Sequence, residues 1–268
     1  ILPMLPHKNL IPDINLTPYS IWLATVVVSG ISYLSYLLKR YVFHESGVLV
    51  SGIIGGLYSS TATISVLARK SRKASEQEAN EYVAAMLLAV SMMFLRFMIL
   101  ILIFSREIFT SIYPYLLIMS VVAAVVAWFI HSRHRRSKDM ADESEDEDSS
   151  NPLEFKVALI FATLFVVFTV LTHYTLVYAG TGGLNLLSFV SGLSDITPFI
   201  LNLLQNTGSV AVLVVVACSM QAIISNILVN MFYALFFAGK GSKLRPWILG
   251  GFGTVIGVNL VLLLFFYL

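Results

Sequence analysis

One stretch decides how this chain folds: Gly52-Ile53-Ile54-Gly55-Gly56-Leu57-Tyr58-Ser59-Ser60-Thr61-Ala62-Thr63. It lies inside an apolar segment, yet glycines and hydroxyl residues make up most of it. A glycine weakens a helix by about 1 kcal/mol relative to alanine. Backbone that leaves the helical hydrogen-bonding pattern inside a bilayer persists only where protein or water satisfies it. The stretch therefore predicts either a tight helix-packing face or a binding site at a break in a helix.

The overall composition indicates a helical membrane protein. Of the 268 residues, 57% are hydrophobic and 12% are charged, whereas about a quarter of the residues in a soluble domain are charged. Long apolar runs alternate with short basic clusters, and about 20 consecutive apolar residues match the thickness of the hydrocarbon layer. The alternating pattern of a membrane barrel is absent from the sequence. We therefore expect an all-α integral membrane protein.

The sequence gives no sign of a cofactor, a nucleic-acid site or an enzymatic mechanism. A single cysteine, Cys218, allows neither a disulfide nor a Cys-based metal site within one chain. No phosphate-binding loop or His/Glu metal signature is present. Ser59, His173 and Asp195 match no nucleophile motif of a hydrolase. We expect no enzyme, no catalytic residues, no bound metal and no cofactor.

The chain divides into two halves with the same plan. We expect an N-terminal approach segment at 1–18, a first membrane repeat at 19–130, a charged cytoplasmic linker at 131–152 and a second membrane repeat at 153–268. The expected membrane segments are 19–38, 47–68, 82–104 and 113–130 in the first repeat, and 153–179, 184–205, 209–238 and 247–268 in the second.

Residues in the two halves correspond at a nearly constant offset. Gly56 and Thr61 match Gly192 and Thr197, each 136 positions later. A weaker copy of the opening stretch thus occupies 191–198. Further residue pairs, such as Pro18 with Pro152 and Ser91 with Ser225, lie 134 positions apart. Matches that occur in order at nearly one offset, together with the same order of membrane segments, indicate an internal repeat.

The distribution of Lys and Arg favours a topology in which segments 47–68 and 184–205 dip into the membrane and return to the same side. This topology places fourteen basic residues in the cytoplasm and leaves only Lys8 and Arg106 outside, with Arg96 in the membrane. Eight plain spans give ten inside and six outside, which fits the positive-inside rule less well. The favoured topology predicts two inverted repeats whose dipping segments are re-entrant or broken helices and meet near mid-membrane. Eight plain spans remain the alternative, because both segments have 22 residues and are long enough to cross.

The hydroxyl groups of the opening stretch are the first candidates for binding a solute. Ser59, Ser60, Thr61 and Thr63 each donate and accept hydrogen bonds. A break beside Gly56 would start a new half-helix, whose N-terminal N–H groups attract anions. The alternative is that these small residues serve only close helix packing.

Asp195 is the only acidic residue deep inside an apolar segment. A charge at the bilayer centre costs at least about 2.5 kcal/mol on insertion scales, so it needs a partner or a function. We expect Asp195 to bind a coupling H⁺ or Na⁺ or to pair with Arg96, with Thr197 beside it at the solute site. The alternative is that Asp195 only caps the helix that begins near Thr197 and Pro198.

Three more polar residues lie inside apolar runs of the flanking segments. Arg96 is central in its span, and the N–H donors of its planar guanidinium group have a fixed geometry that suits a carboxylate or phosphate. Asn226 and Asn230 lie one helical turn apart and share a helix face. All three are candidate solute ligands, and interhelical hydrogen bonding is the alternative role of the two asparagines.

A resemblance to a known family rests on the same stretch. The segment 55–63, followed by Leu67-Ala68-Arg69-Lys70-Ser71-Arg72, resembles the domain of unknown function that follows an MgtC/SapB-type membrane domain in many prokaryotic inner-membrane proteins. Further similarities at Arg96, at 192–195 and at 225–230 extend the resemblance over nearly the whole chain. It implies an N-terminal MgtC-like domain outside this sequence and a multi-pass location in the prokaryotic cytoplasmic (inner) membrane. It implies no particular substrate.

Together these observations lead to one functional expectation and two alternatives. We expect a secondary transporter of a small anionic or zwitterionic solute, such as an amino acid or an organic or inorganic anion, coupled to H⁺ or Na⁺. Its expected partners are the lipid bilayer, the solute, the coupling ion and a second copy in a homodimer, with no nucleic acid. The alternatives are an ion channel in which the two tips form a filter, and a non-transporting scaffold or sensor linked to an MgtC-like domain.

Overall fold

The computed structural model describes residues 2–11, 14–42, 47–72, 74, 76–132, 155–205, 210–239, 242 and 244–267. Across these residues the fold is helical, and the only β-type pairing is one isolated bridge between Ile11 and Ile14. Seven of the described helices are long and apolar enough to cross a membrane. The structure therefore confirms the predicted all-α membrane class.

The helices follow the predicted order along the chain. After a 3₁₀ turn at Leu2–Met4 they are α1 (Pro18–Leu37, continued by a π-helical turn at Leu38–Val42), α2 (Val48–Lys70), α3 (Glu76–Phe104), α4 (Arg106–Ser132), α5 (Phe155–Gly192), α6 (Ile196–Gln205), α7 (Val212–Ala238) and α8 (Arg245–Tyr267). α3 begins six residues before the predicted segment 82–104, because its polar first turns carry no hydropathy signal. The predicted linker 131–152 lies outside the described residues from position 133 onward.

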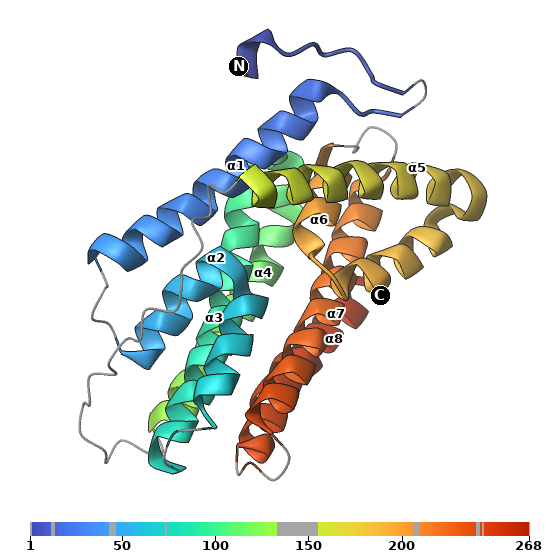
Figure 1. Ribbon diagram of the computed structural model, residues 1–268. Helices are drawn as coiled ribbons and strands as arrows, with labels where there is room; N and C mark the ends of the chain where they lie inside the picture. Colours follow the sequence, from blue (N-terminus) through green and yellow to red (C-terminus); the bar gives the residue numbers. More distant parts are fainter. Residues whose placement is uncertain are drawn as a thin grey trace.

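α3 and α7 are the most deeply buried long helices, and the other helices, α4 and α8 included, pack around them. α2 packs mainly along α3 and also contacts α7, while α5 and α6 pack on α7. In Figure 1, α3, α7 and α8 run along the length of the molecule, and α1 and α5 cross them at an angle. The two segments predicted to carry the site, α2 and the end of α5 with α6, therefore both pack on the central helices.

Glycines allow the segments that carry the site to approach the central helices closely. A Cβ added to Gly56 of α2 would lie 2.5 Å from the Cα of Ala89 on α3. A Cβ added to Gly192 of α5 would lie 2.5 Å from the Ala222 carbonyl oxygen and 2.5 Å from the Ser225 Cβ on α7. Small residues at such contacts let helix backbones pack tightly in a membrane. The predicted packing role of glycine is thus real at Gly56 and Gly192.

α2 is broken inside the opening stretch. Ser59 has an extended backbone, with φ −157° and ψ 107°, between two helical halves. A Cβ on Gly55 would lie 2.5 Å from the Thr63 Oγ1, although eight residues of straight helix span about 12 Å. The two halves of α2 therefore fold back toward each other at Ser59.

The corresponding segment in the second half of the chain is interrupted as well. α5 is broken at Gly180, whose φ of 60° and ψ of −153° favour glycine. α5 ends at Gly192, and α6 begins at Ile196. The predicted segment 184–205 is thus the end of α5 plus α6, separated by the non-helical residues 193–195.

Candidate functional site

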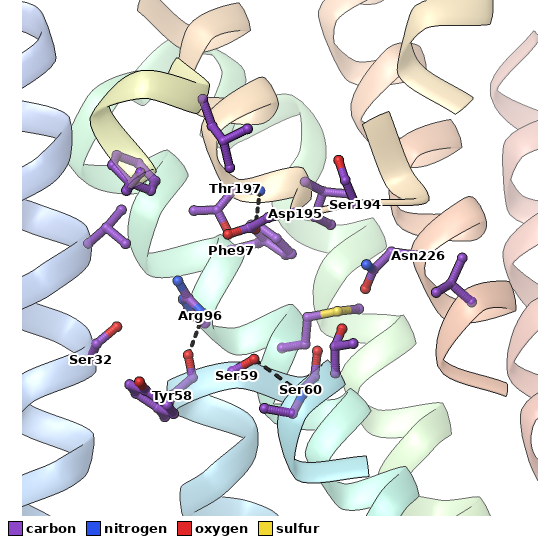
Figure 2. A pocket seen from close by; sticks show the side chains of 18 of the residues that line it. Ser32, Tyr58, Ser59, Ser60, Arg96, Phe97, Ser194, Asp195, Thr197 and Asn226 are labelled. Atoms are coloured by element: carbon purple, nitrogen blue, oxygen red, sulfur yellow. Dashed lines mark hydrogen bonds between the residues drawn. The ribbon is translucent and has the colours of Figure 1, made fainter. Parts of the chain in front are cut away.

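A cavity of about 500 Å³ lies where the break in α2 and the interruption between α5 and α6 approach each other. Figure 2 shows Tyr58, Ser59 and Ser60 on one side of it and Ser194, Asp195 and Thr197 on the opposite side. α1, α3, α5 and α7 complete its walls. Its polar lining residues are Ser29, Ser32, Tyr58, Ser59, Ser60, Thr61, Arg96, Ser194, Asp195, Thr197, Asn226 and Tyr233.

The break in α2 creates a helix N-terminus at the cavity. The Ser59 Oγ accepts a hydrogen bond from the Ala62 N–H at 3.3 Å, so Ser59 caps the second half of α2. Ser60 and Thr61 form the first turn behind this cap, and both line the cavity. The N–H groups of a first turn have no partner within their own helix and carry the positive end of the helix dipole. This wall of the cavity therefore attracts negative charge.

The opposite wall repeats the same local arrangement. The Asp195 Oδ1 accepts a hydrogen bond from the Thr197 N–H at 2.9 Å, so Asp195 caps α6. Asp195 is an exposed residue in the lining of the cavity, whereas Thr197 is buried. The capping role considered from the sequence is thus present, and it uses one of the two carboxylate oxygens. Ser59 and Asp195 lie 136 positions apart, the offset that relates Gly56 to Gly192.

Arg96 of α3 projects between the two walls (Figure 2). In a continuous helix the Tyr58 carbonyl would accept from the Ala62 N–H, but the break at Ser59 separates them. The Arg96 Nη1 donates to the freed Tyr58 carbonyl at 2.8 Å instead. Arg96 therefore stabilises the break in α2. This contact gives a structural reason for a charged residue in the middle of α3.

Arg96 lines the cavity and keeps one donor that no contact among the described residues uses. Within the described part of the chain its Nε is buried and has no hydrogen-bond partner. Asp195 acts on the Arg96 charge through space, but no ion pair within 4.0 Å joins the two side chains. The pairing of Arg96 and Asp195 that the sequence offered as one possibility is therefore not a direct ion pair in this structure, and both residues line the cavity.

A chain of hydrogen bonds through α7 connects the two walls. The Thr61 Oγ1 donates to the Asn230 Oδ1 at 2.8 Å, and the Asn230 Nδ2 donates to the Asn226 Oδ1 at 3.1 Å. The Asn226 Nδ2 then donates to the Gly192 carbonyl at 3.3 Å. Asn230 is fully buried. The predicted interhelical role of the two asparagines is thus observed, and Asn226 also lines the cavity.

The structure brings seven of the ten predicted site residues into one lining: Ser59, Ser60, Thr61, Arg96, Asp195, Thr197 and Asn226. Gly56, Thr63 and Asn230 are not among the lining residues. Gly56 packs on Ala89, Thr63 lies over Gly55 where α2 folds back, and Asn230 lies behind Asn226 in the hydrogen-bonded chain. A role of the lining residues in binding stays a prediction.

Sequence reasoning missed several polar residues of the lining. Ser29 and Ser32 of α1 lie three positions apart on one face of an apolar helix, a pattern that was available as a signal. Tyr58 contributes its backbone carbonyl to Arg96, and residue type carries no information about a freed carbonyl. Ser194 and Tyr233 also line the cavity, and their positions in the sequence show no spacing pattern that would have indicated this.

Comparisons with known proteins identify the chain's relatives without adding a function. A family model described as "Domain of unknown function (DUF4010)" matches residues 26–238. The chain is also similar to a protein of Aquifex aeolicus (strain VF5) described as an uncharacterized protein, with 27% identity over 221 residues that cover 81% of this chain and 94% of that protein. No solved structure gives a significant match. The region matched by the family model contains both interruptions and Arg96.

Proposed function

This chain belongs to the DUF4010 family, and we propose that it is a secondary transporter of a small anionic or zwitterionic solute. The observation that carries the proposal is the placement of two interrupted helices, capped by Ser59 and Asp195, on opposite walls of one cavity. Transporters built from inverted repeats bind solute at such interrupted helices, with the half-helix N-termini directed at anionic groups. Arg96 adds a fixed positive charge between the two walls.

The internal contacts support two inverted repeats as the architecture of this transporter. Gly56 packs on Ala89 and Gly192 packs on Ser225, and the residues of each pair lie 33 positions apart. α1 to α4 correspond in this view to the start of α5, the end of α5 with α6, α7 and α8. The two broken segments then enter from opposite membrane faces, and their tips meet near mid-membrane.

Each charged residue of the cavity has a role in the proposed cycle. Arg96 and the first turn at Ser60 and Thr61 bind the negative group of the solute. The second oxygen of Asp195 binds the coupling H⁺ or Na⁺. Alternating access follows from one repeat rocking against the other, with the Thr61–Asn230–Asn226 chain connecting the two tips.

The cellular setting of the proposal follows the resemblance of segment 55–63. We place the transporter in the prokaryotic cytoplasmic membrane, joined to an MgtC-type membrane domain and paired with a second copy. Co-purification of the native full-length protein from membranes, followed by measurement of its mass, tests both partnerships. A single copy with no MgtC-type partner would contradict this part of the proposal.

Flux into proteoliposomes tests the transport function. The full chain is reconstituted and assayed with amino acids, monocarboxylates and inorganic anions under H⁺ and Na⁺ gradients of both directions. We expect saturable, gradient-driven flux of one class, abolished by Arg96→Gln and Asp195→Asn. Arg106→Gln and Glu107→Gln remove the same charges at exposed positions of α4 and should leave the flux unchanged. Correctly folded protein that moves no solute would refute the proposal, and unsaturable ion conduction would indicate a channel.

A further inference from the structure

We infer that the solute is an α-amino acid with an apolar side chain, whose carboxylate binds at Arg96 and whose ammonium group binds at Asp195. The inference rests on the proposed function, because it names the substrate class of the same cavity. It starts from the charges of the lining: Arg96 is the only basic residue and Asp195 the only acidic residue among the described residues that line the cavity. The two face each other across it without a direct ion pair (Figure 2).

Both charged groups keep binding capacity that their structural contacts do not use. The Arg96 Nη1 is held by the Tyr58 carbonyl, while the buried Nε lacks a partner among the described residues. The Asp195 Oδ1 is held by the Thr197 N–H, so the Oδ2 is the oxygen that a ligand reaches. Each group is thus oriented by one structural bond, and both residues line the cavity in which a ligand would bind.

The opposite signs of these charges select among ligand classes. A ligand with only a negative group at Arg96 would be repelled by Asp195, and a ligand with only a positive group at Asp195 would be repelled by Arg96. Charge interactions strengthen in a low-dielectric interior, so each repulsion weakens binding there more than it would in water. A zwitterion satisfies both groups at once and brings no net charge into the cavity.

The remaining walls indicate what else the ligand carries. The first turn behind Ser59 supplies N–H groups that suit a carboxylate beside Arg96. Val28, Phe97, Ile160, Phe161 and Leu164 form an apolar part of the lining, contributed by α1, α3 and α5. A volume of about 500 Å³ lies within the usual range of small-molecule sites and leaves room for a large aliphatic or aromatic side chain. An amino acid such as leucine or phenylalanine combines these features.

The ammonium group of the solute and the coupling cation are both assigned to the Asp195 carboxylate. Because no other acidic residue of the described chain lines the cavity, the ammonium group of the solute and the coupling cation must occupy the same carboxylate in turn. Transport is then an exchange in which the solute moves against the cation.

Calorimetric titration of the purified full chain tests the inference without any transport step. The ligands are L-leucine, L-phenylalanine, 4-methylpentanoate, which lacks the ammonium group, and 3-methylbutylamine, which lacks the carboxylate. We expect at least one amino acid to bind to the wild-type protein, and leucine, if it binds, to do so at least tenfold more tightly than either analogue. No binding of either amino acid, or equal binding of leucine and 4-methylpentanoate, overturns the inference. Both outcomes are measured on the wild-type protein alone.

Variants then assign each end of the ligand to its residue. Asp195→Asn should weaken leucine binding at least tenfold while 4-methylpentanoate binds as well as before or better, so that the ratio between them collapses. Arg96→Gln should weaken the binding of leucine and leave the binding of 3-methylbutylamine unchanged or tighter. Arg106→Gln and Glu107→Gln should bind all ligands as the wild type does. An unchanged ratio in Asp195→Asn overturns the assignment. Selective leucine binding without flux would refute transport alone, and flux confined to solutes without an ammonium group would refute the amino-acid inference alone.

Discussion

Replacing Gly56 by alanine tests whether α2 is held against α3 as tightly as the structure indicates. The added Cβ would lie 2.5 Å from the Ala89 Cα and 2.6 Å from its carbonyl oxygen, whereas carbon atoms in contact prefer about 3.5–4.0 Å. α2 must therefore move outward by about 1 Å. The contact is with backbone, which cannot rotate away. Overpacking of this kind costs about 1–3 kcal/mol.

Gly257 of α8 provides a matched control for Gly56→Ala. It lies within a helix, and a Cβ added there meets nothing within 4 Å. Gly257→Ala should raise stability by up to about 1 kcal/mol through helix propensity alone. The assay is reversible unfolding of both variants in the same detergent mixture, compared with the wild type. Because both glycines lie within helices, the propensity gain cancels between the two variants, and we expect Gly56→Ala to be less stable than Gly257→Ala by the overpacking cost of about 1–3 kcal/mol. Equal stability would refute the close packing of α2 on α3.

Three further predictions address the cap, the polar chain and the topology. Ser59→Ala should lower the free energy of unfolding by about 1 kcal/mol, whereas Ser59→Asn should keep most of it; equal losses in unfolding assays would contradict the cap. A double-mutant cycle of Thr61→Val and Asn230→Leu should give a coupling energy of about 0.6 kcal/mol, and a coupling of zero would exclude their hydrogen bond. Thiols introduced by Gly47→Cys and Ala74→Cys, in a Cys218→Ala background, should react with impermeant reagents from the same membrane face; reaction from opposite faces would refute the re-entrant path of α2.

The main features of the fold could be predicted because they depend on hydropathy and on local residue chemistry. The break at Ser59 lies inside the stretch that glycines and hydroxyls mark as a poor helix. The boundary expected after 153–179 coincides with the break at Gly180, since glycine is favoured at its positive φ. Asp195 combined a charge with a position just before an apolar helix, which indicated its capping role in advance.

The candidate site was predicted less completely, because its details depend on tertiary geometry. Thr63 carries a hydroxyl group, as Ser59 and Ser60 do. Because α2 folds back at Ser59, however, the Thr63 side chain lies over Gly55 and not in the lining of the cavity. The contribution of Tyr58 is a carbonyl that becomes free only once the helix has broken. Arg96 could be recognised as unusual, and Asp195 could be named as a possible partner, but the observed hydrogen bond to the Tyr58 carbonyl could not be predicted from residue spacing.

Thiol accessibility at Ser194 shows whether the two interrupted helices enclose a solute site inside the membrane. Ser194 is exposed and lines the cavity next to Asp195. Ser194→Cys is introduced in a Cys218→Ala background and treated in oriented vesicles with impermeant reagents applied to either face. We expect labelling from both faces, slowed by an excess of the transported solute. Labelling from the outer face alone, unaffected by any solute, would place residues 193–195 in a surface loop and would refute a solute site enclosed by the two interrupted helices.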